Sequence, residues 1–206
     1  MKILKISILL YFLLFAFEEA AGQVQPVSTV KILLLGNSLS YTNNLPELLQ
    51  QEYASKNIKL EADILAKPNY SLEDHWNEGI FQKMIASGGY NYIIVQQGPS
   101  SQADGLEMLL DYGQKIAKLC RQKEAKLVFF MVWPSISNYH TFEGVINNYT
   151  KAAAKANAIL CPVGKEWKAH FEATKDFSFL GSDGFHPSLK GSQSIAEIIV
   201  KTIKLE

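Results

Sequence analysis

Five short apolar runs, rich in β-branched and aromatic residues, recur along the chain. They cover residues 30–35, 60–65, 92–96, 127–132 and 159–163. Each run is too short for a core helix and too continuous for a half-exposed antiparallel strand. The pattern therefore predicts five strands that are buried on both faces, as in a parallel sheet.

Stretches of helical period separate these runs. Ser71 is followed three residues later by Asp74, which is the pattern of a capping box, and Asn44 precedes Leu45-Pro46-Glu47 as a second cap. Further helices are expected over residues 105–122, 142–158 and 188–203. Strands that alternate with helices predict a three-layer α/β/α sandwich around a five-stranded parallel sheet.

The first 22 residues have a different character. Lys2 and Lys5 precede an apolar run at residues 6–17, and small residues then stand before Gln23. This is the pattern of a secretory signal peptide, so we expect export to the periplasm or the extracellular space. The run is shorter than the roughly 20 residues that span a bilayer, so no stable membrane anchor is expected after cleavage. Residues 23–206 are expected to form a single domain.

Charge and cysteine content narrow the class of protein. The 206 residues carry 20 Lys+Arg and 20 Asp+Glu, so no net field favours a nucleic acid partner, and small-molecule chemistry is the better expectation. Cys120 and Cys161 fall in a predicted helix and a predicted strand, where buried free thiols are common. Neither has a second Cys or His at ligand spacing, so we expect no disulfide and no metal site.

Two segments carry residues with hydrolytic potential. In an open parallel sheet, ligands bind beyond the carboxyl ends of the strands, and Gly36-Asn37-Ser38 follows the first run there. A serine hydroxyl on such a turn is accessible to a base. Asp183 stands three residues before His186, close enough to orient its imidazole. Each pattern alone is also ordinary turn chemistry.

Together, the Gly-Asn-Ser turn and the Asp-Gly-Phe-His segment resemble the SGNH, or GDSL-like, hydrolases. The resemblance extends over nearly the whole chain after the leader. It implies a flavodoxin-like α/β fold and a serine esterase that works through an acyl-enzyme. In that family Ser38 would be the nucleophile, His186 the base and Asp183 its orienting acid. The resemblance implies no metal and no organic cofactor.

The resemblance also suggests an oxyanion hole. Its donors would be the backbone N–H groups of Ser38 and of Asn69, which replaces the glycine usual in the family; asparagine tolerates a left-handed backbone well. Where the family has an asparagine as third donor, this chain has Ser100. We expect the Gln97 amide to substitute, with Gln96 as the alternative, since adjacent strand residues point to opposite faces.

Three further residues are weighed against this site. Trp133 follows the fourth predicted strand and either floors an acyl or sugar site or closes the core. His75 lies in an amphipathic helix beside Trp76 and is expected to pack rather than to catalyse. Ser40 is a rival nucleophile, but only Ser38 directly follows the strand and its glycine.

The sequence thus predicts an exported serine esterase whose substrate is a small-molecule or glycan ester. Short acyl groups, acetyl above all, on carbohydrates are the favoured substrates. Two alternatives remain open at this point. One is an acyltransferase that uses the same three residues, and the other is a ligand-binding protein on a hydrolase scaffold that has lost its activity.

Overall fold

A computed structural model describes residues 29–203 of the chain, and the predicted signal peptide lies outside them. Five parallel strands form one sheet in the order β2-β1-β3-β4-β5. They are β1 (Thr29–Gly36), β2 (Lys59–Ala66), β3 (Tyr92–Val95), β4 (Lys126–Phe130) and β5 (Ile159–Cys161). This order reverses direction between β1 and β3, so the carboxyl end of β1 opens into the crevice where ligands bind in such sheets.

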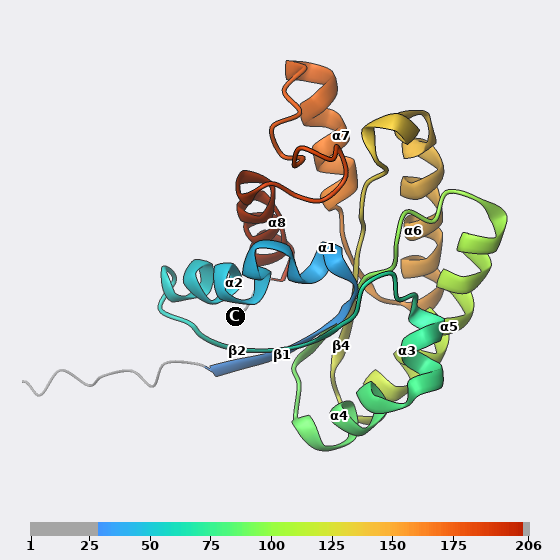
Figure 1. The fold of residues 1–206 in the computed structure, drawn as a ribbon. Helices are drawn as coiled ribbons and strands as arrows, with labels where there is room; N and C mark the ends of the chain where they lie inside the picture. The colour runs from blue at the N-terminus through green and yellow to red at the C-terminus, as the bar shows by residue number, and fades with distance from the viewer. Residues whose placement is uncertain (1–28, 204–206) are drawn as a thin grey trace, which may run out of the picture.

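Helices cover both faces of the sheet, which confirms the three-layer prediction (Figure 1). Helices α2 and α8 pack together on one side, and α5 and α6 pack together on the other. The helical segments are α1 (Ser38–Tyr41), η1 (Thr42–Asn44), α2 (Leu45–Ala54), α3 (Leu72–Glu78), α4 (Ile80–Gly88), α5 (Ala103–Gln122), η2 (Ile136–Thr141), α6 (Phe142–Ala156), α7 (Val163–Thr174) and α8 (Leu189–Thr202).

The strands differ in burial according to their place in the sheet. All of β3 and nearly all of β1 are buried, as predicted. The prediction is wrong for β2 and β5, in which most side chains are only half-buried. Both are edge strands with a neighbour on one side only, so helices and loops cover them less completely.

Capping signals in the sequence predicted a helix start correctly where the capping side chain accepts a backbone N–H of its own helix. Ser71 and Asp74 form the predicted capping box at the start of α3. Helix α2 begins after Asn44 as predicted, but the asparagine side chain bonds Glu47 rather than a backbone N–H, so its predicted capping role is wrong. Helix α4 was not predicted; Gly79, at φ 74°, ends α3 and allows the next helix to start at once.

The core holds the two cysteines as free, buried thiols. Burial raises the pKa of each thiol to about 12, so both are protonated at neutral pH. Between residues 29 and 203, no helix is both long and apolar enough to cross a membrane.

Candidate active site

The turn after β1 carries Ser38 and is held in place by hydrogen bonds to the buried side chain of Gln96. The Gln96 side-chain oxygen accepts hydrogen bonds from the Asn37 N–H and the Ser40 hydroxyl, each at 2.9 Å. A Cβ atom at Gly36 would lie 2.5 Å from both that oxygen and the Ser40 hydroxyl, so any larger residue would displace this network. Ser40 is buried and engaged in this network, which removes it as a rival nucleophile.

A buried histidine supports the same turn from α3. His75 is fully buried, and its Nε2–H donates to the Gly36 carbonyl at 2.7 Å. Burial lowers the pKa of His75, because the charged imidazolium would lose its hydration. The residue therefore packs beneath the turn, as expected from the sequence.

The loop before α8 brings His186 to Ser38. The Ser38 hydroxyl lies 2.9 Å from His186 Nε2, and His186 Nδ1 lies 2.6 Å from Asp183 Oδ2. A carboxylate only accepts hydrogen bonds, so Nδ1 carries the ring proton and Nε2 accepts from the serine. The bond from the His186 ring, followed by the one from the Phe185 N–H, lowers the pKa of Asp183. Such an array can move a proton from a hydroxyl to an imidazole.

Three hydrogen bonds fix the backbone around His186. The Phe185 carbonyl accepts from the Trp133 indole N–H at 2.9 Å, and the His186 carbonyl accepts from the backbone N–H of Gly181 at 2.7 Å. The Pro187 carbonyl accepts from the Asn43 amide at 2.9 Å. Each of the three consecutive carbonyls is thus held by a different segment.

Two of these hydrogen-bond partners, Trp133 and Asn43, differ from what the sequence predicted. Trp133 is fully buried and packs on Trp167 with ring centroids 3.8 Å apart, so it closes the core, and its alternative role as the floor of a pocket is wrong. Asn43 was missed altogether. Its left-handed backbone, at φ 56°, and the Asn43-Asn44 pair are the only local signals that mark this position.

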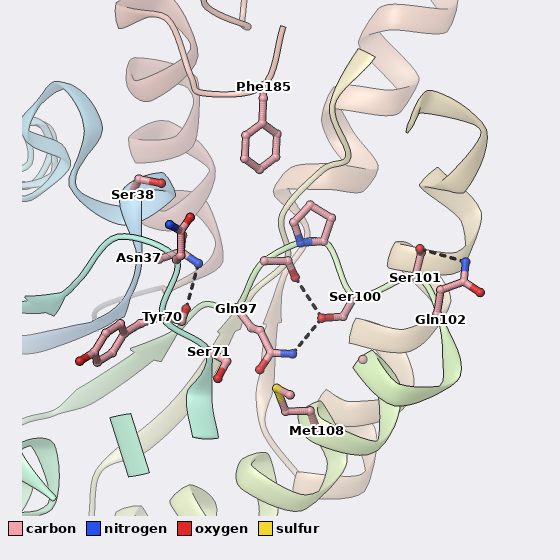
Figure 2. A pocket seen from close by; sticks show the side chains of 14 residues that line it. Asn37, Ser38, Tyr70, Ser71, Gln97, Ser100, Ser101, Gln102, Met108 and Phe185 are labelled. Atoms are coloured by element: carbon pink, nitrogen blue, oxygen red, sulfur yellow. Dashed lines mark hydrogen bonds between the residues drawn. The ribbon is translucent and has the colours of Figure 1, made fainter. Parts of the chain in front are cut away.

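Two backbone N–H groups beside the serine are available to a ligand. Among residues 29–203, neither the Ser38 N–H nor the Asn69 N–H has a hydrogen-bond acceptor. Asn69 has φ 62°, the left-handed conformation that was expected where the family has glycine. Both residues line a pocket of about 440 Å³. Figure 2 shows this pocket with Ser38 labelled.

The two neighbouring glutamines point to different places. Gln97 lines the pocket, where its amide donates to Ser100 Oγ at 2.9 Å and its oxygen accepts from the Leu72 N–H (Figure 2). Gln96 is buried under the serine turn and does not line this pocket. Ser100 also lines the pocket, and its hydroxyl donates to the Gly98 carbonyl. Of the two glutamines, only Gln97 can present an amide N–H to a ligand in this pocket.

The region described offers no cluster of three or more His, Cys, Asp or Glu side chains that could hold a metal ion. The titratable side chains in the hydrogen-bond chain that starts at Ser38 are those of His186 and Asp183.

Comparison with known proteins places the fold. No family model matches the sequence, and no curated protein matches it. Solved structures do match. A protein from Slackia heliotrinireducens classed as an SGNH hydrolase is 21% identical, with a TM-score of 0.75 over 86% of this chain and 100% of that one.

Two esterase-type structures match nearly as well. An acetyl xylan esterase is 13% identical, with a TM-score of 0.70 over 85% of this chain and 100% of its own. A lipase/acylhydrolase from Enterococcus faecalis is 15% identical, with a TM-score of 0.68 over 84% of this chain and 95% of its own. The fold expected from the two sequence motifs is thereby confirmed, and the chain has the architecture of the SGNH hydrolases.

Proposed function

We propose that the chain is an exported serine ester hydrolase that removes short acyl groups, acetyl above all, from carbohydrates. The observation that carries this proposal is the continuous hydrogen-bond chain from Ser38 Oγ through His186 to Asp183, with separations of 2.9 and 2.6 Å. Three residues from opposite ends of the sequence meet in the geometry that nucleophilic acyl transfer requires.

The proposed reaction has two halves. Ser38 Oγ attacks the ester carbonyl while His186 Nε2 takes its proton, and Asp183 stabilises the resulting imidazolium. The imidazolium then gives that proton to the departing alcohol, which leaves an acyl group on Ser38. A water molecule, deprotonated by His186 in turn, releases the acid and restores the serine.

The oxyanion would be stabilised by donors that surround the same point. The free N–H groups of Ser38 and Asn69 supply two of them, and the second amide proton of Gln97 supplies the third. Removal of one such donor typically costs on the order of 3 kcal/mol of transition-state stabilisation. The amide of Gln97 is already aligned by its bonds to Leu72 and Ser100, so little reorganisation is needed during the reaction.

The carbohydrate ester is supported by two kinds of observation. The solved structures with this fold include an acetyl xylan esterase. Nine of the 14 residues that line the pocket beside Ser38 carry a neutral hydroxyl or amide group, and Pro99, Met108 and Phe185 add apolar surface. A lining of hydroxyls and amides suits a neutral polyhydroxyl compound better than a long acyl chain.

The test is hydrolysis of p-nitrophenyl acetate and of a longer-chain homologue by purified protein, with Ser38→Ala alongside. We expect the acetate to be the better substrate and Ser38→Ala to lose activity by a factor on the order of 10⁴ or more. Ser87→Ala, an exposed serine of α4, is the matched control and should keep full activity. Equal turnover by wild type and Ser38→Ala would refute the nucleophile, and free acid that fell short of the phenol released would indicate transfer to an acceptor.

A further inference from the structure

A second pocket, of about 570 Å³, adjoins the pocket at Ser38. The two share Pro99, Ser101 and Phe185 as lining residues, so they lie on either side of these side chains. None of the three residues in the proposed reaction lines the second pocket. Its remaining lining residues are Pro134, Ser135, Asn138 and Thr141.

The second pocket lies on the side of the histidine. Phe185 directly precedes His186, and the Ile136 N–H donates to the Gly184 carbonyl at 2.9 Å, which joins the η2 segment to the His186 loop. In an ester hydrolase the histidine must reach the oxygen of the departing alcohol to give it a proton. The alcohol part of the substrate is therefore directed towards this loop and the pocket beside it.

The lining of the second pocket is neutral and mixed. Proline and phenylalanine rings supply flat apolar surface, while serine, threonine and asparagine side chains supply hydrogen-bonding groups, and none of the lining residues is charged. Among residues 29–203, the side-chain oxygen of Asn138 accepts no hydrogen bond. The Ser101 hydroxyl accepts from Gln102 at 3.3 Å and keeps its proton free to donate. Such a lining matches sugar rings, which have apolar faces and neutral hydroxyls at their edges.

The volumes of the two pockets indicate how many sugar units the site can hold. With the roughly 30 Å³ that a water molecule occupies in the liquid as an upper limit per heavy atom, an acetyl group takes at most on the order of 100 Å³ and a pyranose unit at most roughly 300 Å³. One acetylated sugar unit then accounts for the pocket of about 440 Å³ at Ser38. The further 570 Å³ has room for at least one more unit.

We propose that the second pocket binds the sugar units next to the acetylated one, so that the substrate is an acetylated oligosaccharide or polysaccharide rather than an acetylated monosaccharide. The proposal rests on the ester hydrolase function argued above. It assigns Asn138 as a residue that determines specificity on the alcohol side, because its free oxygen can accept a sugar hydroxyl.

The experiment compares acetylated xylose with acetylated xylotriose, which differ in chain length and not in the acyl group. For the wild type we expect kcat/KM to rise about tenfold from the monosaccharide to the trisaccharide. Asn138→Ala should reduce that gain about fivefold through the lost hydrogen bond, and Asn138→Trp should abolish it by filling the pocket. His140→Ala changes an exposed residue of the same segment that lines neither pocket, and it should keep the gain.

Two results would overturn the proposal. One is a wild type that gains nothing from the longer chain, and the other is a gain that survives both substitutions of Asn138. Failure of the underlying function is distinguishable from either, because Ser38→Ala would then hydrolyse p-nitrophenyl acetate as fast as the wild type. Circular dichroism of the Asn138 variants, expected to match the wild type, separates a lost contact from a lost fold.

Discussion

The turn that carries Ser38 is buried and is held by side chains, whereas the loop that carries His186 is exposed and is held mainly through its backbone. Under the serine, Gln96 and His75 have almost no accessible surface. On the other side, the side chains of His186 and Asp183 are 39% and 51% exposed. The two halves of the site thus depend on different kinds of interaction.

The difference follows from where each half lies in the fold. The serine turn directly follows β1, a central strand, so the residues that support it come from the core. The histidine loop joins a surface segment to α8, and it contacts the core through the Trp133 hydrogen bond to the Phe185 carbonyl and through the packing of the Phe185 ring. Substitutions near the serine should therefore reduce stability together with activity, and substitutions near the histidine should reduce activity alone.

The largest effect is expected from the exposed half. Asp183→Asn keeps an oxygen that accepts the Phe185 and His186 N–H groups, but it removes the charge that stabilises the imidazolium. We expect kcat for p-nitrophenyl acetate to fall by a factor on the order of 10³ to 10⁴, with little change in urea unfolding. Asp176→Asn, in a neighbouring turn that bonds Ser178, is the control for a lost surface carboxylate. A large loss of stability in Asp183→Asn would contradict the comparison.

The next largest effect is expected from the buried half. Gln96→Leu leaves the Asn37 N–H and the Ser40 hydroxyl buried without their acceptor, at a cost of about 1–3 kcal/mol for each. We expect the free energy of unfolding to fall by about 3 kcal/mol, measured in urea, and activity to fall with it. Gln114→Leu, on the exposed face of α5, should change neither. An active Gln96→Leu protein of normal stability would show that the serine turn does not need this support.

Motifs whose partners are close in the sequence were predictable. The Ser71 and Asp74 pair bonds within one turn of helix, and the Asp183 and His186 pair lies within one loop, so spacing alone pointed to both. The alternation of apolar runs likewise predicted the sheet and its three layers, because buried parallel strands need continuous apolar sequence. Only the pairing of Ser38 with His186 spans the chain, and the family resemblance supplied it.

Roles that depend on distant partners were not predictable in this way. Gln96 was considered as an oxyanion donor, but its oxygen binds the serine turn 59 residues earlier. Trp133, in the loop after β4, had two open roles, and Trp167, to which it packs, comes from α7. Asn43 bonds Pro187 across 144 residues and carries no motif of its own. In each case tertiary contacts decide what the polar or aromatic group does.

A smaller effect is expected from Asn43, whose side chain links the segment after the serine turn to the histidine loop. Asn43 donates to the Pro187 carbonyl and to Ser192 Oγ, each at 2.9 Å. Asn43→Gly removes both bonds while it keeps the left-handed backbone free of strain. We expect kcat to fall about tenfold as the His186 loop loses its register, with KM for p-nitrophenyl acetate nearly unchanged.

The neighbouring asparagine provides a close control for that prediction. Asn44 is also left-handed, at φ 54°, and it is exposed like Asn43, but its side chain bonds Glu47 in the first turn of α2 rather than the histidine loop. Asn44→Gly should therefore keep the wild-type kcat. Equal losses in the two variants would mean that backbone flexibility, rather than the bond to Pro187, sets the rate.

The smallest effect is the loss of stability at low pH. The two halves of the site should lose stability in different pH ranges. Burial lowers the pKa of His75 in the folded protein, so the unfolded chain binds the proton first as the pH falls below about 6.5, and stability decreases there. Hydrogen bonds lower the pKa of Asp183 in the folded protein. The stability contributed by the ionised carboxylate is therefore present above about pH 3.9 and is lost as the pH falls from there through the lower pKa of the folded state.

Urea unfolding of wild type and a His75 variant at about pH 7.5 and about pH 5 tests the buried half, because Asp183 stays ionised over that range and the other histidines are common to both proteins. His75→Leu should show a smaller drop in stability between the two pH values than the wild type, while the Gly36 carbonyl keeps its bond from the Lys67 N–H. His140→Leu, at an exposed site, should keep the wild-type drop. If His75→Leu kept it too, the buried histidine would not be the group that makes the serine side sensitive to acid.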